Sequence, residues 1–248
     1  ASARVGGIKA NSDFPAEFIY ENLQIQSNII EGAKISNIKK LVFIGSSCIY
    51  PRNCKQPIKE EYLLSGKLES TNQWYAVAKI AGIKMVEAYR KQYNLNFVNV
   101  MPCNMYGPKD NYDKKNSHVM AALIRKFCIA KKNNLKDVIV WGSGKSLREF
   151  MHVDDFAEAM AKIIKKYNKI EPINVGSGQE ISILNLARKI SKVVDFKGKI
   201  IFDKKYPDGT PRKLLNISKI RKLGWKPKIS LLNGIRKSVN DYNKLINY

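Results

Sequence analysis

The chain alternates between two patterns of hydrophobic and polar positions. Residues 40–45, KLVFIG, form a short and almost continuously apolar run, which is typical of a strand buried on both faces of a parallel sheet. Residues 15–35 instead carry apolar side chains at helical spacing, and Pro15 is well placed in the first turn of a helix. The same two patterns predict strands at 95–102, 137–142 and 199–203, and helices at 72–93, 117–132, 154–167, 183–194 and 230–246.

Strands that alternate with helices predict an α/β fold with a doubly wound, parallel sheet. From about residue 105 onward the predicted strands are shorter and loops are more frequent, with one loop expected at 103–111 and a turn-rich stretch at 206–213. We therefore expect residues 1–105 to form one domain, to which some later segments return, and residues 106–248 to form mainly a smaller domain. A cleft between the two is the expected ligand site.

The net charge of +23 does not change this picture. The basic residues are mostly lysine and are spread along the whole chain, whereas a nucleic-acid-binding protein more often clusters arginine. We interpret the charge as a lysine-rich bias on solvated helix faces, which is compatible with a site for an anionic small molecule. No apolar run approaches the roughly 20 residues needed to span a bilayer, so we do not expect a membrane as a partner. Because the basic residues are dispersed lysines, we do not expect a nucleic acid as a partner either.

The four cysteines, Cys48, Cys54, Cys103 and Cys128, lack the spacing of a structural zinc site. Sparse cysteines in a chain of 248 residues are typical of free thiols in a reducing compartment, so we predict a cytoplasmic protein without a bound metal. We interpret Cys54, Cys103 and Cys128 as structural residues. His152, which follows a predicted strand in REFMHVDD, is interpreted in the same way.

Two short motifs carry candidate chemistry. In YAVAK, Tyr75 and Lys79 lie four residues apart on one face of the predicted 72–93 helix, although this spacing alone also occurs often on surface helices. A nearby ammonium favours the phenolate, so we expect Lys79 to lower the pKa of Tyr75 and prepare it for proton transfer. In GSSCIYP, Ser46 follows a buried strand, at the sheet edge where open α/β folds place their ligands. Its hydroxyl is expected near the same substrate oxygen as Tyr75.

A serine at a strand end, followed by a Tyr-x-x-x-Lys helix, resembles the catalytic set of the short-chain dehydrogenase/reductase superfamily. The stretch REFMHVDD resembles the extended branch of that superfamily, which acts on nucleotide sugars. A narrower resemblance is carried by the strings GSSCIYP, TNQWYAVAKIAGIK, MPCNMYGPKDNY, NSHVM, VWGSG, REFMHVDD and PDGTPRKLL. Through them the chain resembles the GDP-L-fucose synthase family within this branch, which epimerises and reduces GDP-4-keto-6-deoxy-D-mannose. The resemblance implies a Rossmann-type sheet followed by a substrate domain.

The resemblance also implies roles for five residues. Epimerisation at the two carbons beside the keto group needs a base on one face and an acid on the other, and the family assigns this work to Cys48 and His118. Reduction of the keto carbon follows, with Tyr75 protonating the forming alkoxide and Ser46 polarising its oxygen. Lys79 is expected to tune Tyr75 and to bind the ribose of the nicotinamide coenzyme.

The coenzyme implied by the resemblance is NADPH, and the substrate is a GDP-sugar. The expected coenzyme-binding residues are Ile44, Gly45, Ser46, Ser47, Lys79, Pro102, Cys103, Asn104, Met105 and His118. The expected substrate-binding residues are Lys126, Trp141, Arg148 and Asp208. Arg148 is suited to a diphosphate, whereas Lys126 stands where the family often has an arginine and keeps the charge without the bidentate geometry.

A glycine-rich turn that cradles the coenzyme pyrophosphate is absent from the sequence. Compared with the family, the chain is expected to be a fragment that lacks the first strands of the sheet. Without the first strand of a Rossmann-type sheet, the strand at 40–45 is expected to become an exposed edge. The isolated polypeptide is then expected to bind NADPH poorly and to aggregate.

Two other functions stay open at the level of sequence. The nearest is another extended short-chain enzyme, an epimerase or a dehydratase of nucleotide sugars, which would use Tyr75 and Lys79 without needing Cys48 and His118 as a pair. The remote one is a non-enzymatic, basic scaffold with a Rossmann-like fold. The resemblance further implies a homodimer that pairs through the helices at 15–35 and 72–93.

Overall fold

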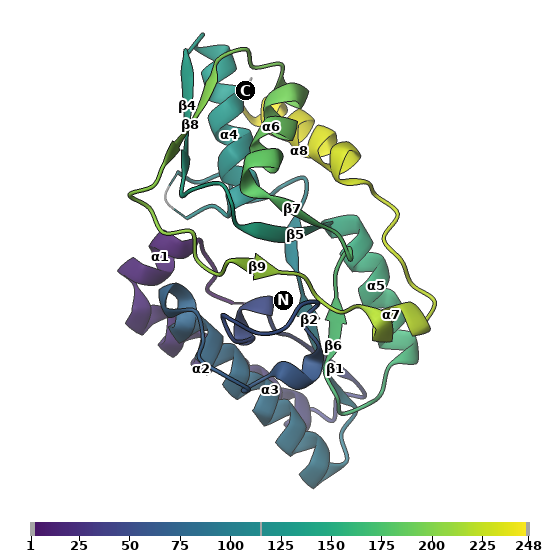
Figure 1. Cartoon of the computed structure of the whole chain (residues 1–248). Coiled ribbons are helices and arrows are strands. Elements are labelled where there is room, and N and C mark those ends of the chain that lie inside the picture. The colour runs from purple at the N-terminus through teal and green to yellow at the C-terminus, as the bar shows by residue number, and fades with distance from the viewer. Residues whose placement is uncertain (1–2, 115, 247–248) are drawn as a thin grey trace.

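A computed structural model of the chain describes residues 3–114 and 116–246 (Figure 1). Its helices are α1 (Ile8–Asp13), α2 (Pro15–Ile35), α3 (Gln73–Tyr93), α4 (Val119–Lys132), α5 (Val153–Lys166), α6 (Ile183–Val194), α7 (Ser218–Lys222) and α8 (Leu231–Ile246). Its strands are β1 (Leu41–Ile44), β2 (Phe97–Pro102), β3 (Asn104–Tyr106), β4 (Asp137–Trp141), β5 (Leu147–His152), β6 (Ile173–Val175), β7 (Glu180–Ser182), β8 (Lys199–Asp203) and β9 (Arg212–Lys213). The predicted helices and strands are all present, with bounds that differ by at most two residues.

The first sheet has the order β1-β2-β6, and both of its pairings are parallel. Every residue of β2 is buried, as the continuous apolar run predicts for a central strand. The predicted parallel α/β fold is therefore confirmed. Among residues 3–114 and 116–246, β1 pairs with β2 alone and forms an edge of this sheet, as expected.

Helices α2 and α3 pack together against the first sheet, and Figure 1 shows them side by side at one end of the molecule. Their close approach depends on Gly82, because a Cβ there would lie 2.4 Å from the ring of Phe43 and 2.7 Å from Oε1 of Gln26. The buried Gln26 side chain donates a hydrogen bond of 2.6 Å from Nε2 to the carbonyl of Ala78. This contact fixes α2 against the helix that carries Tyr75 and Lys79.

The remaining strands form two further sheets. Strands β3, β5 and β7 pair in that order, β9 pairs with β5, and β4 pairs with β8. The expectation of a loop at 103–111 is wrong for residues 104–106, which form β3 and pair with β5. Strand β7 runs antiparallel to β5, whereas β9 runs parallel to it. Strands of two or three residues are too short to show a hydrophobic period, which is why the sequence did not reveal them.

Buried apolar side chains form two clusters. One cluster surrounds the first sheet with α3 and α5, and the other lies among α4, α6, α8 and β4. Figure 1 shows these parts at opposite ends of the molecule, with β5, β7 and β9 between them. The domain boundary at residues 105 and 106 stays a prediction. Within the described part of the chain, no helix combines the length and apolar character needed to cross a bilayer.

Candidate active site

The carboxyl end of β1 turns sharply into the GSSCIYP motif, in which Ser46 and Cys48 are partly exposed and the other residues are buried. Gly45 donates a backbone hydrogen bond of 2.8 Å to the carbonyl of Val100, and a Cβ at Gly45 would lie 2.6 Å from the sulfur of Met101. The next residue, Ser46, caps a short 3₁₀ turn, because its Oγ accepts a hydrogen bond of 3.2 Å from the backbone N–H of Cys48. The turn therefore places Ser46 and Cys48 together at the edge of the sheet.

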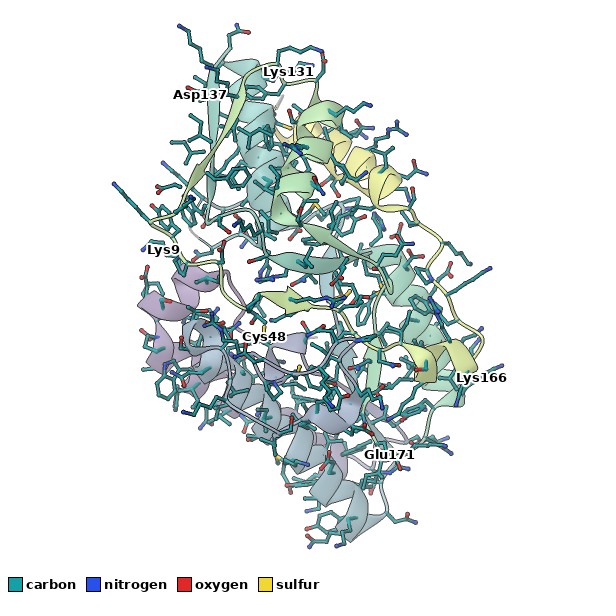
Figure 2. The ribbon with its side chains drawn as sticks, viewed as in Figure 1. Lys9, Cys48, Lys131, Asp137, Lys166 and Glu171 are labelled. Atoms are coloured by element: carbon teal, nitrogen blue, oxygen red, sulfur yellow. The ribbon has the colours of Figure 1, made fainter. Side chains whose placement is uncertain are left out.

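Figure 2 marks Cys48 in the middle part of the molecule. Its sulfur receives two polar contacts from other parts of the chain. The side-chain amide of Asn72, just before α3, lies 3.2 Å from Sγ, and Nζ of Lys213 on β9 lies 3.3 Å from it. Burial opposes ionisation of the thiol, but Lys213, a hydrogen bond with Ser46 and the charge of Arg148 together lower its pKa. Cys48 is therefore a cysteine in an environment that favours the thiolate.

Tyr75 and Lys79 lie on the inner face of α3, close to the same turn. Nζ of Lys79 donates a hydrogen bond of 3.0 Å to the carbonyl of Ile44 and lies 5.8 Å from the ring centroid of Tyr75. Burial lowers the pKa of Lys79 to about 8. Burial also raises the pKa of Tyr75, Cys48 adds to this effect, and only a hydrogen bond with Ser46 acts against it.

The expectation that Lys79 lowers the pKa of Tyr75 is wrong for this structure. Desolvation is the largest influence on the phenol, and the ammonium of Lys79 is directed to the carbonyl of Ile44. A raised pKa keeps Tyr75 protonated at neutral pH. The phenol is therefore ready to donate a proton rather than to accept one.

His118 precedes the first turn of α4 in extended conformation, with φ −72° and ψ 162°. Its side chain does not cap the helix, so the imidazole is left for other contacts. The pKa of His118 lies below its usual value, because desolvation and the charge of Lys213 lower it more than the carboxylate of Asp110 raises it. Lys213 thus acts electrostatically on both Cys48 and His118.

Of the predicted coenzyme-binding residues, those at 44–47 and 102–105 lie at or just after the carboxyl ends of β1 and β2, which are adjacent in the first sheet. Lys79 lies on α3, and His118 directly precedes α4. Cys103 donates its backbone N–H to the carbonyl of Val175 at 2.9 Å, and its buried thiol has a pKa well above the usual value because of desolvation. Asn104 donates a hydrogen bond of 2.9 Å from Nδ2 to the carbonyl of Glu149. These anchored strand ends and the buried ammonium of Lys79 fit the nicotinamide and ribose portion of a dinucleotide.

The side chain of Arg148 contacts the backbone of Asp208. Nη2 of Arg148 donates a hydrogen bond of 3.0 Å to the carbonyl of Asp208. The carboxylate of Asp208 accepts hydrogen bonds from the backbone N–H of Ser143 at 2.8 Å and from its hydroxyl at 2.7 Å. Asp208 therefore fixes the turn after β4, and its contribution to substrate binding stays a prediction.

Trp141 and Lys126 form the exposed end of the candidate site. The ring of Trp141 stacks on Tyr206, with centroids 4.2 Å apart and an interplanar angle of 10°. Nζ of Lys126 lies 4.8 Å from the Trp141 centroid and donates a hydrogen bond of 2.8 Å to the carbonyl of Ile139. A flat aromatic surface beside a cation is suited to a nucleotide base.

Three residues of this arrangement were missed at the level of sequence: Asn72, Tyr206 and Lys213. Asn72 and Lys213 lie inside strings that carried the resemblance, and their contact with Cys48 joins residues more than 20 and more than 160 positions away. No spacing rule connects such distant residues. Among the described residues, no cluster of three or more His, Cys, Asp or Glu side chains could hold a metal ion.

Comparison with known proteins agrees with this geometry. Residues 1–176 match the family model described as the NAD dependent epimerase/dehydratase family. The chain belongs to this family. Over 236 residues it is 55% identical to the probable GDP-L-fucose synthase 1 of Oryza sativa subsp. japonica, a match that covers 95% of this chain and 72% of that protein.

Two solved structures show the same fold. A GDP-6-OMe-4-keto-L-xylo-heptose reductase from C. jejuni matches with a TM-score of 0.92 and 37% identity, covering 99% of this chain and 81% of that one. A GDP-L-fucose synthetase from Naegleria fowleri bound to NADP matches with a TM-score of 0.88 and 28% identity, covering 94% of this chain and 75% of that one. The predicted resemblance to GDP-L-fucose synthases and the predicted fold class are both confirmed.

Proposed function

We propose that this chain carries the catalytic residues of the GDP-L-fucose synthase reaction. In that reaction GDP-4-keto-6-deoxy-D-mannose is epimerised at the two carbons beside the ketone, and the ketone is then reduced with NADPH to give GDP-L-fucose. The observation that carries this proposal is the Cys48 thiol, which lies on the same turn as Ser46 and contacts both Asn72 and Lys213. A reductase alone needs Ser46 and the Tyr75 phenol but has no need of an activated thiol.

The epimerisation is a proton exchange next to a ketone. The Cys48 thiolate removes the proton from the carbon, and the negative charge is delocalised onto the ketone oxygen as an enolate. His118, in its protonated form, returns a proton to the opposite face of the same carbon, so the configuration inverts. The lowered pKa of Cys48 supports its role as the base. Desolvation lowers the pKa of His118, and the carboxylate of Asp110 acts against this shift, toward the protonated form that the proposal requires.

The reduction uses a different set of side chains on the same turn. When bound, NADPH supplies the hydride to the ketone carbon. Tyr75 donates its phenolic proton to the oxygen, which its raised pKa permits because the phenol stays protonated at neutral pH. Ser46 donates a hydrogen bond to the same oxygen. Lys79 binds a ribose hydroxyl of the coenzyme, and its hydrogen bond to the carbonyl of Ile44 at the carboxyl end of β1 supports this role.

The sugar nucleotide is held by the remaining predicted residues. Arg148 binds the diphosphate, since its guanidinium is fixed by the carbonyls of Leu147 and Asp208. Lys126 and Trp141 bind the guanosine end, where an aromatic face and a cation lie together.

We also propose that the chain forms a homodimer and is located in the cytoplasm. Large apolar side chains are exposed on the helices α2 and α3, namely Tyr20, Ile29, Ile35, Trp74, Val77 and Tyr93. Two such helices buried against their copies would form a compact interface. The cytoplasmic location is supported by four free cysteines. Sedimentation of the purified chain measures the dimer, and Trp74→Lys should shift it toward the monomer.

The chemical proposal is tested by replacing Cys48 with Ser. In D₂O the chain should introduce deuterium beside the ketone, and Cys48→Ser should slow this exchange by about a hundredfold or more, as expected for loss of an acid–base group. Cys54→Ser is the matched control and should exchange normally. Exchange that persists in Cys48→Ser contradicts the proposal. A wild-type chain that oxidises NADPH with a GDP-keto sugar but introduces no deuterium is a reductase alone.

A further inference from the structure

Lys213 reaches the sulfur of Cys48 from a strand on the other side of the candidate site. Its Nζ lies 3.3 Å from Sγ, and Nδ2 of Asn72 lies 3.2 Å from the same atom. A neutral thiol is a weak acceptor, whereas a thiolate accepts hydrogen bonds from amides and ammonium groups strongly. Two donors directed at one sulfur therefore match the ionised form of Cys48 better than the neutral form.

We propose that Lys213 is a positioning residue that holds Cys48 as a thiolate and so makes it the base of the epimerisation. This inference rests on the proposed function, in which Cys48 takes the proton from the carbon beside the ketone. Lys213 itself exchanges no proton with the substrate. It acts through the sulfur, by ion pairing and by a hydrogen bond.

The placement of the neighbouring charges supports this role. Arg148 on β5 and Lys213 on β9 are paired residues of two parallel strands, so their side chains leave the sheet on the same face. Like charges directly opposite each other are destabilising unless an anion lies near them. The hydrogen bonds described for Arg148 go to two backbone carbonyls, and the contact described for Nζ of Lys213 goes to the Cys48 sulfur. A thiolate supplies a negative charge beside both cations, in addition to the carboxylates of Asp208 and Glu69, which act on Arg148.

The charged and titratable groups that face the thiol come from three elements. They are Lys213 from β9, Arg148 from β5 and Tyr75 from α3. The two cations favour the thiolate. Tyr75 is a neutral phenol at neutral pH, since burial raises its pKa. Beyond Lys213, His118 is subject to the same ammonium and to the opposing carboxylate of Asp110.

The strand that carries Lys213 is held firmly in place. Leu215 donates its backbone N–H to Oε2 of the buried Glu149 at 2.9 Å, and Leu214 donates to Oε1 of Gln56 at the same distance. Arg212 forms an ion pair with Glu180 through both carboxylate oxygens. Anchors on both sides of Lys213 fix the backbone from which its long side chain extends. Less conformational entropy is then lost when the ammonium contacts sulfur.

The test measures the ionisation of Cys48 in the absence of substrate. Alkylation by iodoacetamide follows the thiolate fraction, so its rate against pH reports the pKa of the thiol. The chain with Cys54→Ser is the starting protein, and Cys48→Ser in that background gives the blank for the buried cysteines. Lys213→Met removes the ammonium at similar length, and Lys213→Arg restores a cation. Lys204→Met, on an exposed lysine earlier in the same segment, is the matched control.

Lys213→Met should raise the pKa of Cys48 by about one unit and slow alkylation at pH 7 about tenfold. Lys213→Arg should keep most of the wild-type rate, and Lys204→Met should keep all of it. An unchanged alkylation profile in Lys213→Met, together with a raised KM for the GDP-sugar, overturns the inference and identifies Lys213 as a diphosphate ligand.

Two further measurements keep the test decisive. Urea unfolding of each variant shows whether Lys213→Met is folded. If Lys213→Met is not folded, the comparison of variants is replaced by a titration of the chain that keeps Lys213. The absorbance of its thiolate near 240 nm is followed against pH, and titration of Cys48 at or above about pH 8.5 overturns the inference. Deuterium exchange in Cys48→Ser tests the proposed function separately. A chain whose exchange depends on Cys48 but whose thiol ignores Lys213 refutes the inference alone.

Discussion

The two ends of the candidate site are built in different ways. At the chemical end, Cys48 contacts side chains from two distant segments, Asn72 and Lys213, and its pKa is shifted by its surroundings. At the nucleotide end, Trp141 and Tyr206 are 41% and 37% exposed and stack on each other at the surface.

The difference reflects what each end is proposed to do. Proton transfer requires groups whose pKa values are set by burial and by nearby charges, and such groups need rigid support because an unpaired buried charge is costly. Binding of a base requires a flat apolar surface and a cation, which work well when partly exposed. We therefore expect substitutions at the chemical end to change rates and substitutions at the nucleotide end to change substrate affinity.

The largest effect is expected from Tyr75→Phe. The variant keeps the ring and its packing against Phe18 but loses the phenolic proton. The rate of NADPH oxidation with the keto sugar should fall by about a hundredfold or more, the usual contribution of a general acid. Since the pKa of Tyr75 is raised, the wild-type rate should show no loss from phenol ionisation between pH 6 and pH 9.

Deuterium exchange beside the ketone is the internal control for Tyr75→Phe. It depends on Cys48 and His118 in our proposal and should stay within a few-fold of the wild-type rate. Equal loss of exchange and reduction would mean that the two steps share one proton donor, and the assignment of separate side chains would then be wrong.

The support of the chemical end can be tested through Glu149. Its side chain is fully buried, and burial raises its pKa from 4.5 to about 7, against hydrogen bonds from the backbone N–H groups of Leu215, Gly178 and Ser177. Because the pKa of Glu149 is higher in the folded state, the protonated side chain contributes to the free energy of unfolding, and this contribution is fully present below about pH 4.5. It is lost as the pH rises through about 7.

The measurement is the free energy of unfolding in urea for the wild type and for Glu149→Gln. Between pH 5 and pH 8 the wild type should lose up to about 3 kcal/mol relative to this variant, as a pKa raised from 4.5 to about 7 implies. Glu61→Gln, which changes an exposed carboxylate, should keep a nearly constant difference from the wild type. A constant difference for Glu149→Gln as well would mean that Glu149 stays charged over this range.

The sequence allowed most of the regular structure to be predicted, because the helices and the longer strands have clear hydrophobic periods. Helix α2 begins at Pro15 and ends at Ile35, as the pattern of apolar positions indicated. Strands β3, β6, β7 and β9 are two or three residues long and have no readable period. Yet β9 carries Lys213, so one of the shortest elements contributes to the centre of the candidate site.

The candidate site was predicted less completely than the fold. Ser46, Cys48, Tyr75 and Lys79 lie in two short motifs, GSSCIYP and YAVAK, and the resemblance identified them together. The contact between Lys213 and Cys48 depends on how β9 pairs with β5, which the sequence does not show. The direction in which the pKa of Tyr75 is shifted was predicted wrongly, because the motif reveals the neighbouring lysine but not how deeply the phenol is buried.

The smallest effect is expected at the nucleotide end, from Trp141→Leu. The variant keeps an apolar side chain but loses the stack with Tyr206 and the contact with Lys126. Aromatic stacking on a base contributes on the order of 1–3 kcal/mol, so KM for the GDP-sugar should rise about tenfold. The value of kcat should stay within about twofold, because the residues that exchange protons are unchanged.

Ile139→Leu, which changes an exposed apolar residue on the same strand, is the matched control and should leave both constants unaltered. If Trp141→Leu lowered kcat with KM unchanged, the nucleotide end would take part in the chemistry, and the contrast between the two ends would not hold.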